Sequence, residues 1–284
     1  MTDVLYLMGG LGLGGTERHL SLVLPQLARR GWRLEVALLT EIGCFGEPLA
    51  AAGVPVRALG KPRVPPIPKL RGLLQLRGQA QLLAERLRLL HPRILHCFLP
   101  TCCIVGSWAA RAAGYKSVAM SRRSQASRPS LFLGDKWLEL RALSTANIVL
   151  GHSHWVMREL ENEGVAPECL RLVHNGIALT PRRLDNQERN AIRATEGWLE
   201  DEPIIVSVAN LIPYKGHVEL LKALGQVAAA GMRRWRLVLI GDGAPNMSRH
   251  FTRSPPTFKS WTASNLPEFV MILDDCSQER TLVF

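Results

Sequence analysis

A lysine and a glycine stand where a short apolar run gives way to a helical pattern. The run Ile204–Val208 has the composition of a buried strand, and residues 218–230 carry apolar side chains at helical spacing. Lys215 and Gly216 lie between the two. The first N–H groups of a helix have no intrahelical partner and the helix dipole is positive there, so such a turn attracts a phosphate. The pattern predicts binding of a phosphorylated ligand.

A second glycine-bearing turn occupies residues 9–17, after an apolar run at residues 4–8 and before another helical pattern. Its last four residues are Gly14, Gly15, Thr16 and Glu17. The turn also satisfies G-x-G-x-x-G, with Gly10, Gly12 and Gly15, and Glu41 follows the next strand, as in dinucleotide sites. Three interpretations stay open: a tight turn that only requires glycine, a contact with phosphate or sugar, which we favour, and a dinucleotide site.

Short apolar runs alternate with helical patterns along most of the chain, which predicts α/β architecture with a parallel sheet covered by helices. The expected strands are 4–8, 34–39, 54–59, 94–98, 117–121, 148–150, 170–173, 204–208 and 237–240. The expected helices are 16–30, 47–52, a long one ending near 90, 102–113, 131–143, 153–163 and 218–230, with Ser153 as an N-cap.

This alternation, and the point at which it stops, divides the chain into four expected segments. Residues 1–174 are expected to form a complete Rossmann-like domain, and residues 175–200 a polar, irregular linker. Residues 201–243 are expected to begin a second Rossmann-like domain, and residues 244–284 to form an irregular tail with at most one short strand, Phe269–Leu273. Prolines at positions 245, 255, 256 and 267 interrupt that tail. A second doubly wound domain would need on the order of 100 further residues, so we expect a truncated one.

The composition limits the classes of molecule that this protein is expected to bind. Of the 284 residues 47% are hydrophobic and 21% charged, as in globular proteins, and no apolar run is long enough to span a bilayer. The net charge of +11 fits a phosphorylated substrate, an anionic membrane surface or nucleic acid. Aromatic residues are only 6% and do not alternate with basic ones, which argues against nucleic acid. The six cysteines form no paired C-x-x-C pattern, so no zinc site is indicated. We expect a cytoplasmic protein without a signal peptide.

Four motifs stand in an order that resembles the retaining GT-B glycosyltransferases of family 4. They are Gly14-Gly15-Thr16-Glu17-Arg18, His174-Asn175-Gly176-Ile177, Val208-Ala209-Asn210-Leu211 with Lys215-Gly216-His217, and Leu239-Ile240-Gly241-Asp242-Gly243. The resemblance covers residues 1–243. It implies two Rossmann-like domains that hold a nucleoside-diphosphate sugar, and an acceptor that is a glycan or a lipid-linked molecule.

The same resemblance assigns roles to single residues. Lys215 would pair with the diphosphate leaving group, so neither a metal nor a cofactor is required. The loop of Gly14 and Gly15 would lie close to the donor phosphates and the acceptor, and the loop of Asn175 and Gly176 would touch the ligand. The complete set of substrate-binding candidates is Gly14, Gly15, Thr16, Glu17, His96, Asn175, Gly176, Asn210, Gly216, Gly241 and Gly243.

The sequence departs from the family pattern at three places. Asn210 replaces an arginine five positions before the lysine, which predicts a weaker phosphate clamp, because an amide carries no charge. Arg122 stands where many members have a histidine near the reacting sugar; it is our second catalytic candidate, with a solvated loop charge as the alternative. The family's glutamate pair has no counterpart, since Glu268 and Glu279 lack its context. The chain is thus expected to be weak or inactive.

Further expectations are less specific. His96, near the end of a strand, would face the ligand edge or serve as a hydrogen-bonded structural histidine. The basic residues Arg71, Arg77, Arg86, Arg88 and Arg93 predict either a helix that docks on anionic lipid at the inner face of the membrane or an ordinary solvated face. Two other functions stay open: a dinucleotide-dependent oxidoreductase, and a non-catalytic fragment that only binds an acceptor.

Overall fold

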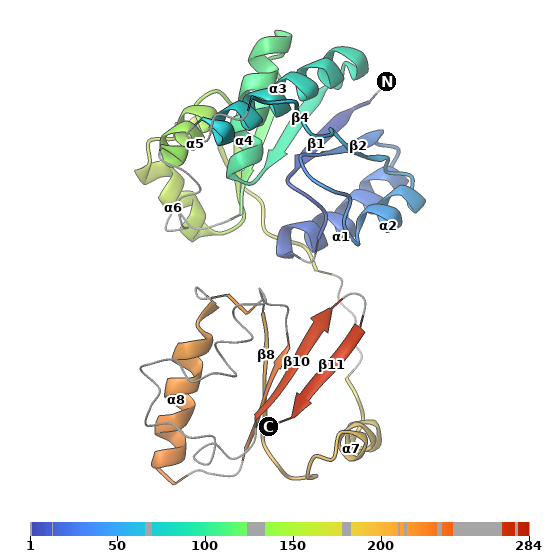
Figure 1. The fold of residues 1–284 in the computed structure, drawn as a ribbon, viewed down its shortest axis with the longest axis vertical. Coiled ribbons are helices and arrows are strands. Elements are labelled where there is room, and N and C mark those ends of the chain that lie inside the picture. The colour runs from blue at the N-terminus through green and yellow to red at the C-terminus, as the bar shows by residue number, and fades with distance from the viewer. Residues whose placement is uncertain are drawn as a thin grey trace. The chain divides into compact units, whose positions relative to one another are not determined.

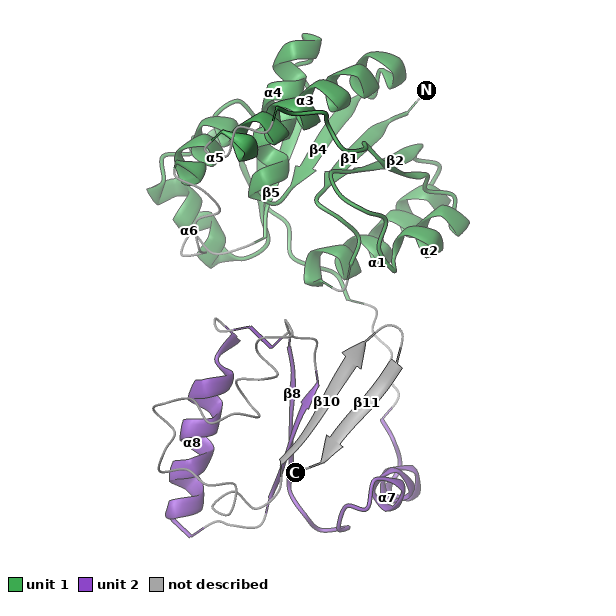
Figure 2. Cartoon of the chain, in the orientation of Figure 1, with its two compact units in different colours: residues 1–180 green, residues 181–284 purple. Residues whose placement is uncertain are grey.

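The computed structural model describes residues 2–12, 14–65, 70–123, 134–177, 183–209, 211–212, 215–231 and 235–240, and the backbone of 269–275 and 278–283. The chain divides into two compact units, residues 1–180 and residues 181–284, coloured separately in Figure 2. Each unit has its own sheet (Figure 1). The units are therefore described one at a time.

Unit 1 is built on a seven-stranded, fully parallel sheet with the order β3-β2-β1-β4-β5-β6-β7. The strands are β1 (Val4–Met8), β2 (Leu34–Leu38), β3 (Val56–Ala58), β4 (Ile94–Phe98), β5 (Val118–Arg122), β6 (Ile148–Gly151) and β7 (Leu170–Leu172). This is the doubly wound arrangement, whose strand order reverses between β1 and β4. All seven expected strands of the first domain are present, with ends shifted by at most two residues.

Helices cover the two faces of this sheet unequally. They are α1 (Gly15–Arg29), α2 (Gly46–Ala51), α3 (Arg71–Leu90), α4 (Pro100–Ala113), α5 (Asp135–Leu143) and α6 (His154–Asn162), followed by a 3-10 turn at Pro167–Cys169. One apolar cluster joins α1 and α2 to β1 and β2; another joins α3, α4, α5 and α6 to the opposite face. Right-handed crossovers produce this division, because the chain winds in opposite directions on either side of β1.

Beyond β4, no described helix of unit 1 covers the face of the sheet on which α1 packs. Ile94 of β4 is 38% exposed, Ile148 of β6 is 41% exposed, and Val173, just past β7, is 51% exposed. By contrast, every residue of β1 and β2 is buried. The open part of the sheet therefore begins beside α1, at the reversal of strand order where ligands of such folds bind.

Unit 2 contains a four-stranded sheet with the order β11-β10-β9-β8. Its elements are α7 (Asn186–Thr195), β8 (Ile204–Val208), α8 (His217–Ala229), β9 (Arg236–Ile240), β10 (Phe269–Asp275) and β11 (Gln278–Val283). The strands β8, β9 and β10 are parallel, and β11 pairs antiparallel with β10. A small core of Leu224, Ala228, Trp235, Leu237 and Leu239 joins α8 to β9.

Two expectations about the second half were wrong in detail. Residues 175–200 are not irregular throughout, because α7 forms within them. Its start is fixed by a capping box in which the Glu188 N–H donates to Asp185 Oδ1 at 2.8 Å and the Asp185 N–H donates to Glu188 Oε2 at 3.0 Å. Nor is the tail irregular to its end, because β10 extends the sheet along the edge of β9 and β11 adds a hairpin. The interrupting prolines all precede residue 269.

Candidate functional site

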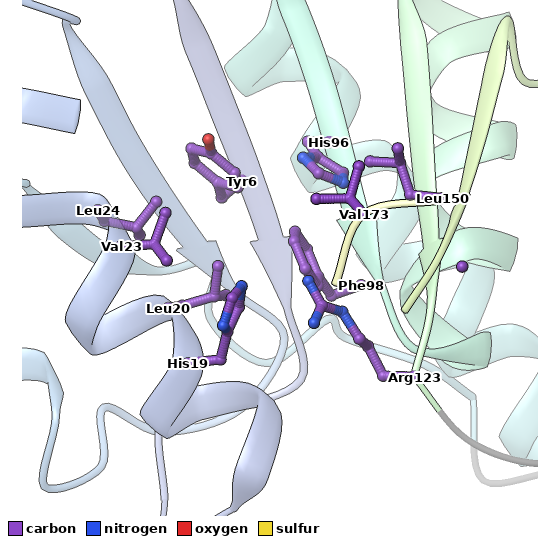
Figure 3. Close-up of a pocket in the computed structure, with 11 residues that line it drawn as sticks. Tyr6, His19, Leu20, Val23, Leu24, His96, Phe98, Arg123, Leu150 and Val173 are labelled. Atoms are coloured by element: carbon purple, nitrogen blue, oxygen red, sulfur yellow. The ribbon is translucent and has the colours of Figure 1, made fainter. Parts of the chain in front are cut away.

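A pocket of about 140 Å³ opens in unit 1 between α1 and the sheet (Figure 3). Its walls come from α1, from the strands β1, β4 and β6, and from the residues just past β5 and β7. The lining residues are Tyr6, His19, Leu20, Val23, Leu24, His96, Phe98, Arg123, Leu150, Gly151 and Val173. The pocket thus lies where the open part of the sheet begins, next to the reversal between β1 and β4.

His96 lines this pocket, as one of its two predicted roles requires. Its Nε2 atom lies 2.8 Å from Ser121 Oγ, and its ring centroid is 4.3 Å from that of Phe98. Burial, and secondarily the charge of Arg123, lower the pKa of His96 to about 3. The ring is therefore neutral near pH 7. It is hydrogen-bonded within the fold and also in reach of a ligand, so the two predicted roles are not exclusive.

His19 faces the same pocket and was not foreseen. Its Nδ1 atom is buried with no hydrogen-bond partner among the described residues. Burial and then Arg123 lower the pKa of His19, against an opposing contribution from a hydrogen bond with the Gly176 backbone. His19 stands one turn into α1, directly after the motif that ends at Arg18. The helical spacing of Thr16, His19 and Val23 would have placed it on the sheet-facing side.

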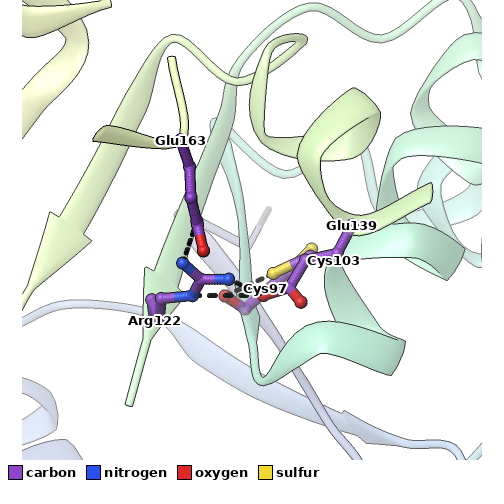
Figure 4. Close-up of polar contacts among 5 residues, drawn as sticks. All are labelled: Cys97, Cys103, Arg122, Glu139 and Glu163. Carbon is purple, nitrogen blue, oxygen red and sulfur yellow. Dashed lines mark hydrogen bonds and ion pairs between the residues drawn. The ribbon is translucent and has the colours of Figure 1, made fainter. Parts of the chain in front are cut away.

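Arg122 turns away from this pocket into the opposite layer (Figure 4). It is only 5% exposed, and its guanidinium donates to Glu139 Oε1 at 2.9 and 3.3 Å and also to Glu163. The alternative of a solvated loop charge is wrong, because Arg122 is the buried last residue of β5. Its catalytic role stays a prediction, and the structure gives it two carboxylate partners that stabilise the junction of β5, α5 and α6.

The neighbouring Arg123, and not Arg122, lines the pocket. Its guanidinium carbon lies 5.4 Å from the centroid of the Phe98 ring, and its Nη1 donates to Asn175 Oδ1. Side chains alternate along a strand, so Ser121 and residue 123 share the face of His96 while Arg122 has the other. The expected strand ended one residue early, at Ser121. If the expected strand had included Arg122, the alternation of side chains would have directed Arg122 away from His96 and identified Arg123 instead.

The loop of Asn175 and Gly176 reaches the pocket rim. Asn175 accepts the hydrogen bond from Arg123, and the backbone of Gly176 interacts with His19. Both residues had been proposed for ligand contact, and both lie next to pocket-lining side chains. Direct contact with a ligand stays a prediction.

The N-terminal glycine loop forms the expected strand-to-helix turn. Gly14 is the N-cap of α1, and a Cβ at this position would lie 2.1 Å from Glu17 Oε2, because the Glu17 carboxylate folds back over the helix N-terminus. Gly15 and Thr16 begin the helix. A Cβ at Gly10 would lie 2.8 Å from Thr40 Oγ1, so close packing against the end of β2 is one reason for glycine here. Glu41, the candidate ribose ligand of a dinucleotide site, is exposed beside Lys61 at 4.0 Å.

In unit 2, Lys215 and Gly216 occupy the predicted turn between β8 and α8. Gly216 is the N-cap of α8 with φ +77°, a left-handed conformation that favours glycine. The Lys215 N–H donates to the Ile212 carbonyl at 3.0 Å, and its side chain is exposed. The remaining candidates, Asn210, Gly241 and Gly243, lie outside the described residues. The turn geometry agrees with an anion site, whereas the roles of these residues stay predictions.

Three further observations concern metal ligands, the basic residues of α3 and the lengths of the helices. Within the described residues no cluster of histidine, cysteine or acidic side chains could hold a metal ion. On α3, Arg86 pairs with Glu35 at 2.6 Å and Arg88 donates to the Ala112 carbonyl at 2.5 Å, whereas Arg71 and Arg77 are exposed. The described helices include none whose length and hydropathy would let it cross a bilayer.

Comparison with solved structures identifies the fold. The Anabaena protein HepE, solved in complex with UDP and glucose, is 18% identical with a TM-score of 0.68, over 89% of this chain and 64% of HepE. Sucrose-phosphate synthase from Thermosynechococcus elongatus is 16% identical with a TM-score of 0.71, over 97% of this chain and 71% of the synthase. A glycosyltransferase from Rickettsia africae is 15% identical with a TM-score of 0.66, over 96% of this chain and 68% of its own. The chain thus has the GT-B fold and spans about two thirds of these proteins.

Family profiles extend this likeness to the sequence. No functionally curated protein matches the sequence as a relative. The profile described as Glycosyl transferases group 1 matches residues 188–250, a stretch that includes Lys215 and Gly216. The profile described as Glycosyltransferase Family 4 matches residues 13–180, which is more than half of the chain and contains most of the pocket. The chain therefore belongs to glycosyltransferase family 4.

Proposed function

We propose that this protein takes part in the transfer of a sugar from a nucleoside-diphosphate donor to a glycan or lipid-linked acceptor. The observation that carries the proposal is the order of the two family matches, residues 13–180 and then residues 188–250. That order is the one in which such an enzyme would present an acceptor-side domain and then a donor-side domain. HepE, which shares the fold, was solved with UDP and with UDP-glucose, and this supports a nucleotide-sugar donor.

The proposed chemistry is a group transfer. An acceptor oxygen, of a hydroxyl or of a phosphate, attacks the anomeric carbon, and the bond from that carbon to the diphosphate oxygen breaks. Any proton on the attacking oxygen passes to the departing diphosphate or to solvent. Lys215, at the N-terminus of α8, would stabilise the charge that develops on the diphosphate, so the reaction would not need a metal ion. We propose that the anomeric configuration is retained, as the resemblance implies.

The two rival functions have less support. A dinucleotide-dependent oxidoreductase would require Glu41 to meet a ribose, and Glu41 is an exposed residue paired with Lys61. Family membership also favours sugar transfer. A fragment that only binds an acceptor would keep the pocket of unit 1 without turnover. We also propose that the protein acts in the cytoplasm and that Arg71 and Arg77, which are exposed on α3, contact anionic lipid.

Isothermal titration with UDP and UDP-glucose tests the proposal. We expect binding that Lys215→Ala weakens about tenfold or more, since one charged hydrogen bond to a phosphate contributes about 1.5–3 kcal/mol. Lys222→Ala is the matched control, because Lys222 is an exposed lysine on the same helix. EDTA should leave binding unchanged. Equal affinity of the wild type and Lys215→Ala, or no binding of any nucleoside diphosphate, would contradict the proposal.

A further inference from the structure

The pocket of unit 1 holds an arginine whose charge has no carboxylate partner among the described residues. Four other arginines have such a partner: Arg33 pairs with Asp3, Arg86 with Glu35, Arg122 with Glu139 and Glu163, and Arg236 with Glu202. Arg123 instead hydrogen-bonds to the neutral amide of Asn175 and stacks on Phe98. A half-buried guanidinium without a counter-ion is costly, because its desolvation is not offset by an opposite charge.

The groups around Arg123 leave this charge uncompensated. No aspartate or glutamate lines the pocket within the part of the chain that the structure describes. The two lining histidines, His19 and His96, have lowered pKa values and are neutral near pH 7. Burial raises the pKa of Tyr6 to about 12, so its hydroxyl keeps its proton. The pocket therefore carries one net positive charge. Figure 3 shows the guanidinium of Arg123 beside Phe98, directed toward His19.

The remaining walls are apolar. Val23 of α1 is half-buried on one side, and Leu150 and Val173 line the other side of the same pocket. A sugar ring would leave most of its hydroxyls without partners on such walls, which is unfavourable. An aliphatic chain would gain about 0.8 kcal/mol for each methylene that leaves water. The pocket thus combines one anion-binding group with a surface for hydrocarbon.

We propose that this pocket binds a phosphate monoester or diphosphate attached to an apolar chain, with the phosphate on Arg123 and the chain against Val23, Leu150 and Val173. Arg123 donates two hydrogen bonds to the phosphate, and the unpartnered Nδ1 of His19 accepts from, or donates to, the same group according to its tautomer. The inference rests on the proposed function, in which this ligand is the acceptor. It assigns the acceptor to the lipid phosphates rather than to free glycans.

The test is an NMR titration of the complete chain with three probes: hexyl phosphate, inorganic phosphate and hexanol. Hexyl phosphate should shift the signals of Arg123 and His19 and bind at least tenfold more tightly than inorganic phosphate or hexanol. Arg123→Gln should weaken the binding of hexyl phosphate at least tenfold and leave the binding of hexanol unchanged. The matched control is Arg141→Gln, because Arg141 stacks on Trp137 at the same 5.4 Å but lies outside the pocket. It should bind as the wild type does.

A second variant guards against loss of folding. Val173 is 51% exposed on the pocket rim, so Val173→Asp should fold. The new carboxylate should weaken the binding of hexyl phosphate, because it gives Arg123 an internal counter-ion. Equal binding of hexyl phosphate and hexanol, or an Arg123→Gln variant that binds hexyl phosphate normally, overturns the inference. Loss of UDP binding in Arg123→Gln with hexyl phosphate unaffected would assign the arginine to the donor and also overturn it. Failure of the donor hypothesis shows separately, as UDP binding indifferent to Lys215→Ala.

Discussion

Two adjacent arginines in this chain have opposite roles because a strand points successive side chains to opposite faces. Arg122 faces the helical layer and is held between Glu139 and Glu163, whereas Arg123 faces the pocket and contacts the neutral groups of Asn175 and Phe98. Residue type alone does not separate them, since both are arginines, one the last residue of β5 and the other the residue after it. What separates them is their place in the pleat, and that place decides which charge is available to a ligand.

His96 should make the stability of unit 1 depend on pH. Its pKa is about 3 in the fold and about 6.5 when unfolded, so between these values the unfolded chain binds the extra proton and stability falls as the pH falls. From pH 7 to pH 5 the linkage corresponds to a loss of about 2 kcal/mol. His96→Gln keeps a polar partner for Ser121 but does not titrate, so its free energy of unfolding should fall less over this interval. Denaturant titrations of both proteins at the two pH values measure the difference, and equal losses would contradict it.

At the scale of single elements, the turn before α8 depends on the left-handed conformation of Gly216. Its φ is +77°, where any Cβ is strained, so Gly216→Ala should cost about 1–2 kcal/mol and Gly216→Asn less. Gly72, in the first turn of α3, has no atom within 4 Å of an added Cβ, so Gly72→Ala should be neutral or stabilising. Hydrogen exchange of the α8 and α3 amides reports each effect. Unchanged protection of α8 in Gly216→Ala would show that the turn tolerates another conformation.

Elements with a strong periodic signal could be predicted from the sequence, and those that depend on partners could not. The apolar strands of unit 1 and the cap of α6, where the Val156 N–H donates to Ser153 Oγ at 3.3 Å, follow from local pattern and capping chemistry. Helix α7 was missed because it is short and mostly polar and buries no residue, although Asp185 and Glu188 have the spacing of a capping box. The pairing of β10 with β9 is non-local and leaves no pattern to read.

The site was partly predictable for the same reason. The glycine loop, the lysine turn and the loop of Asn175 and Gly176 are short contiguous motifs, and topology placed His96 at the correct edge of the sheet. The pocket itself combines side chains of α1, β4 and the end of β5, which only the fold brings together. His19 and Arg123 were missed because each lies one or a few positions beyond a motif, and a shift of one residue in a strand reverses its face.

At the scale of the whole molecule, the apolar clusters of the two units share no residue. Those of unit 1 draw on residues between Val4 and Leu170, and that of unit 2 on residues between Leu224 and Leu239. A domain with its own core can fold alone, and a chain of about 180 residues is long enough to bury one. The two units should therefore respond to mutation independently, whatever the arrangement between them.

This independence can be tested by weakening one core. Leu237 is 1% exposed in the cluster of unit 2, so Leu237→Ala should destabilise that unit by about 2–5 kcal/mol. Hydrogen exchange should show faster exchange in α8 and β9 and unchanged protection in β1 and β4. The matched variant Leu7→Ala, at a residue fully buried in β1, should show the reverse. Residues 1–180 produced alone should then unfold cooperatively at the denaturant concentration at which unit 1 unfolds in the complete chain. A lower midpoint for the isolated unit, or loss of β1 protection in Leu237→Ala, would mean that the two cores are energetically coupled.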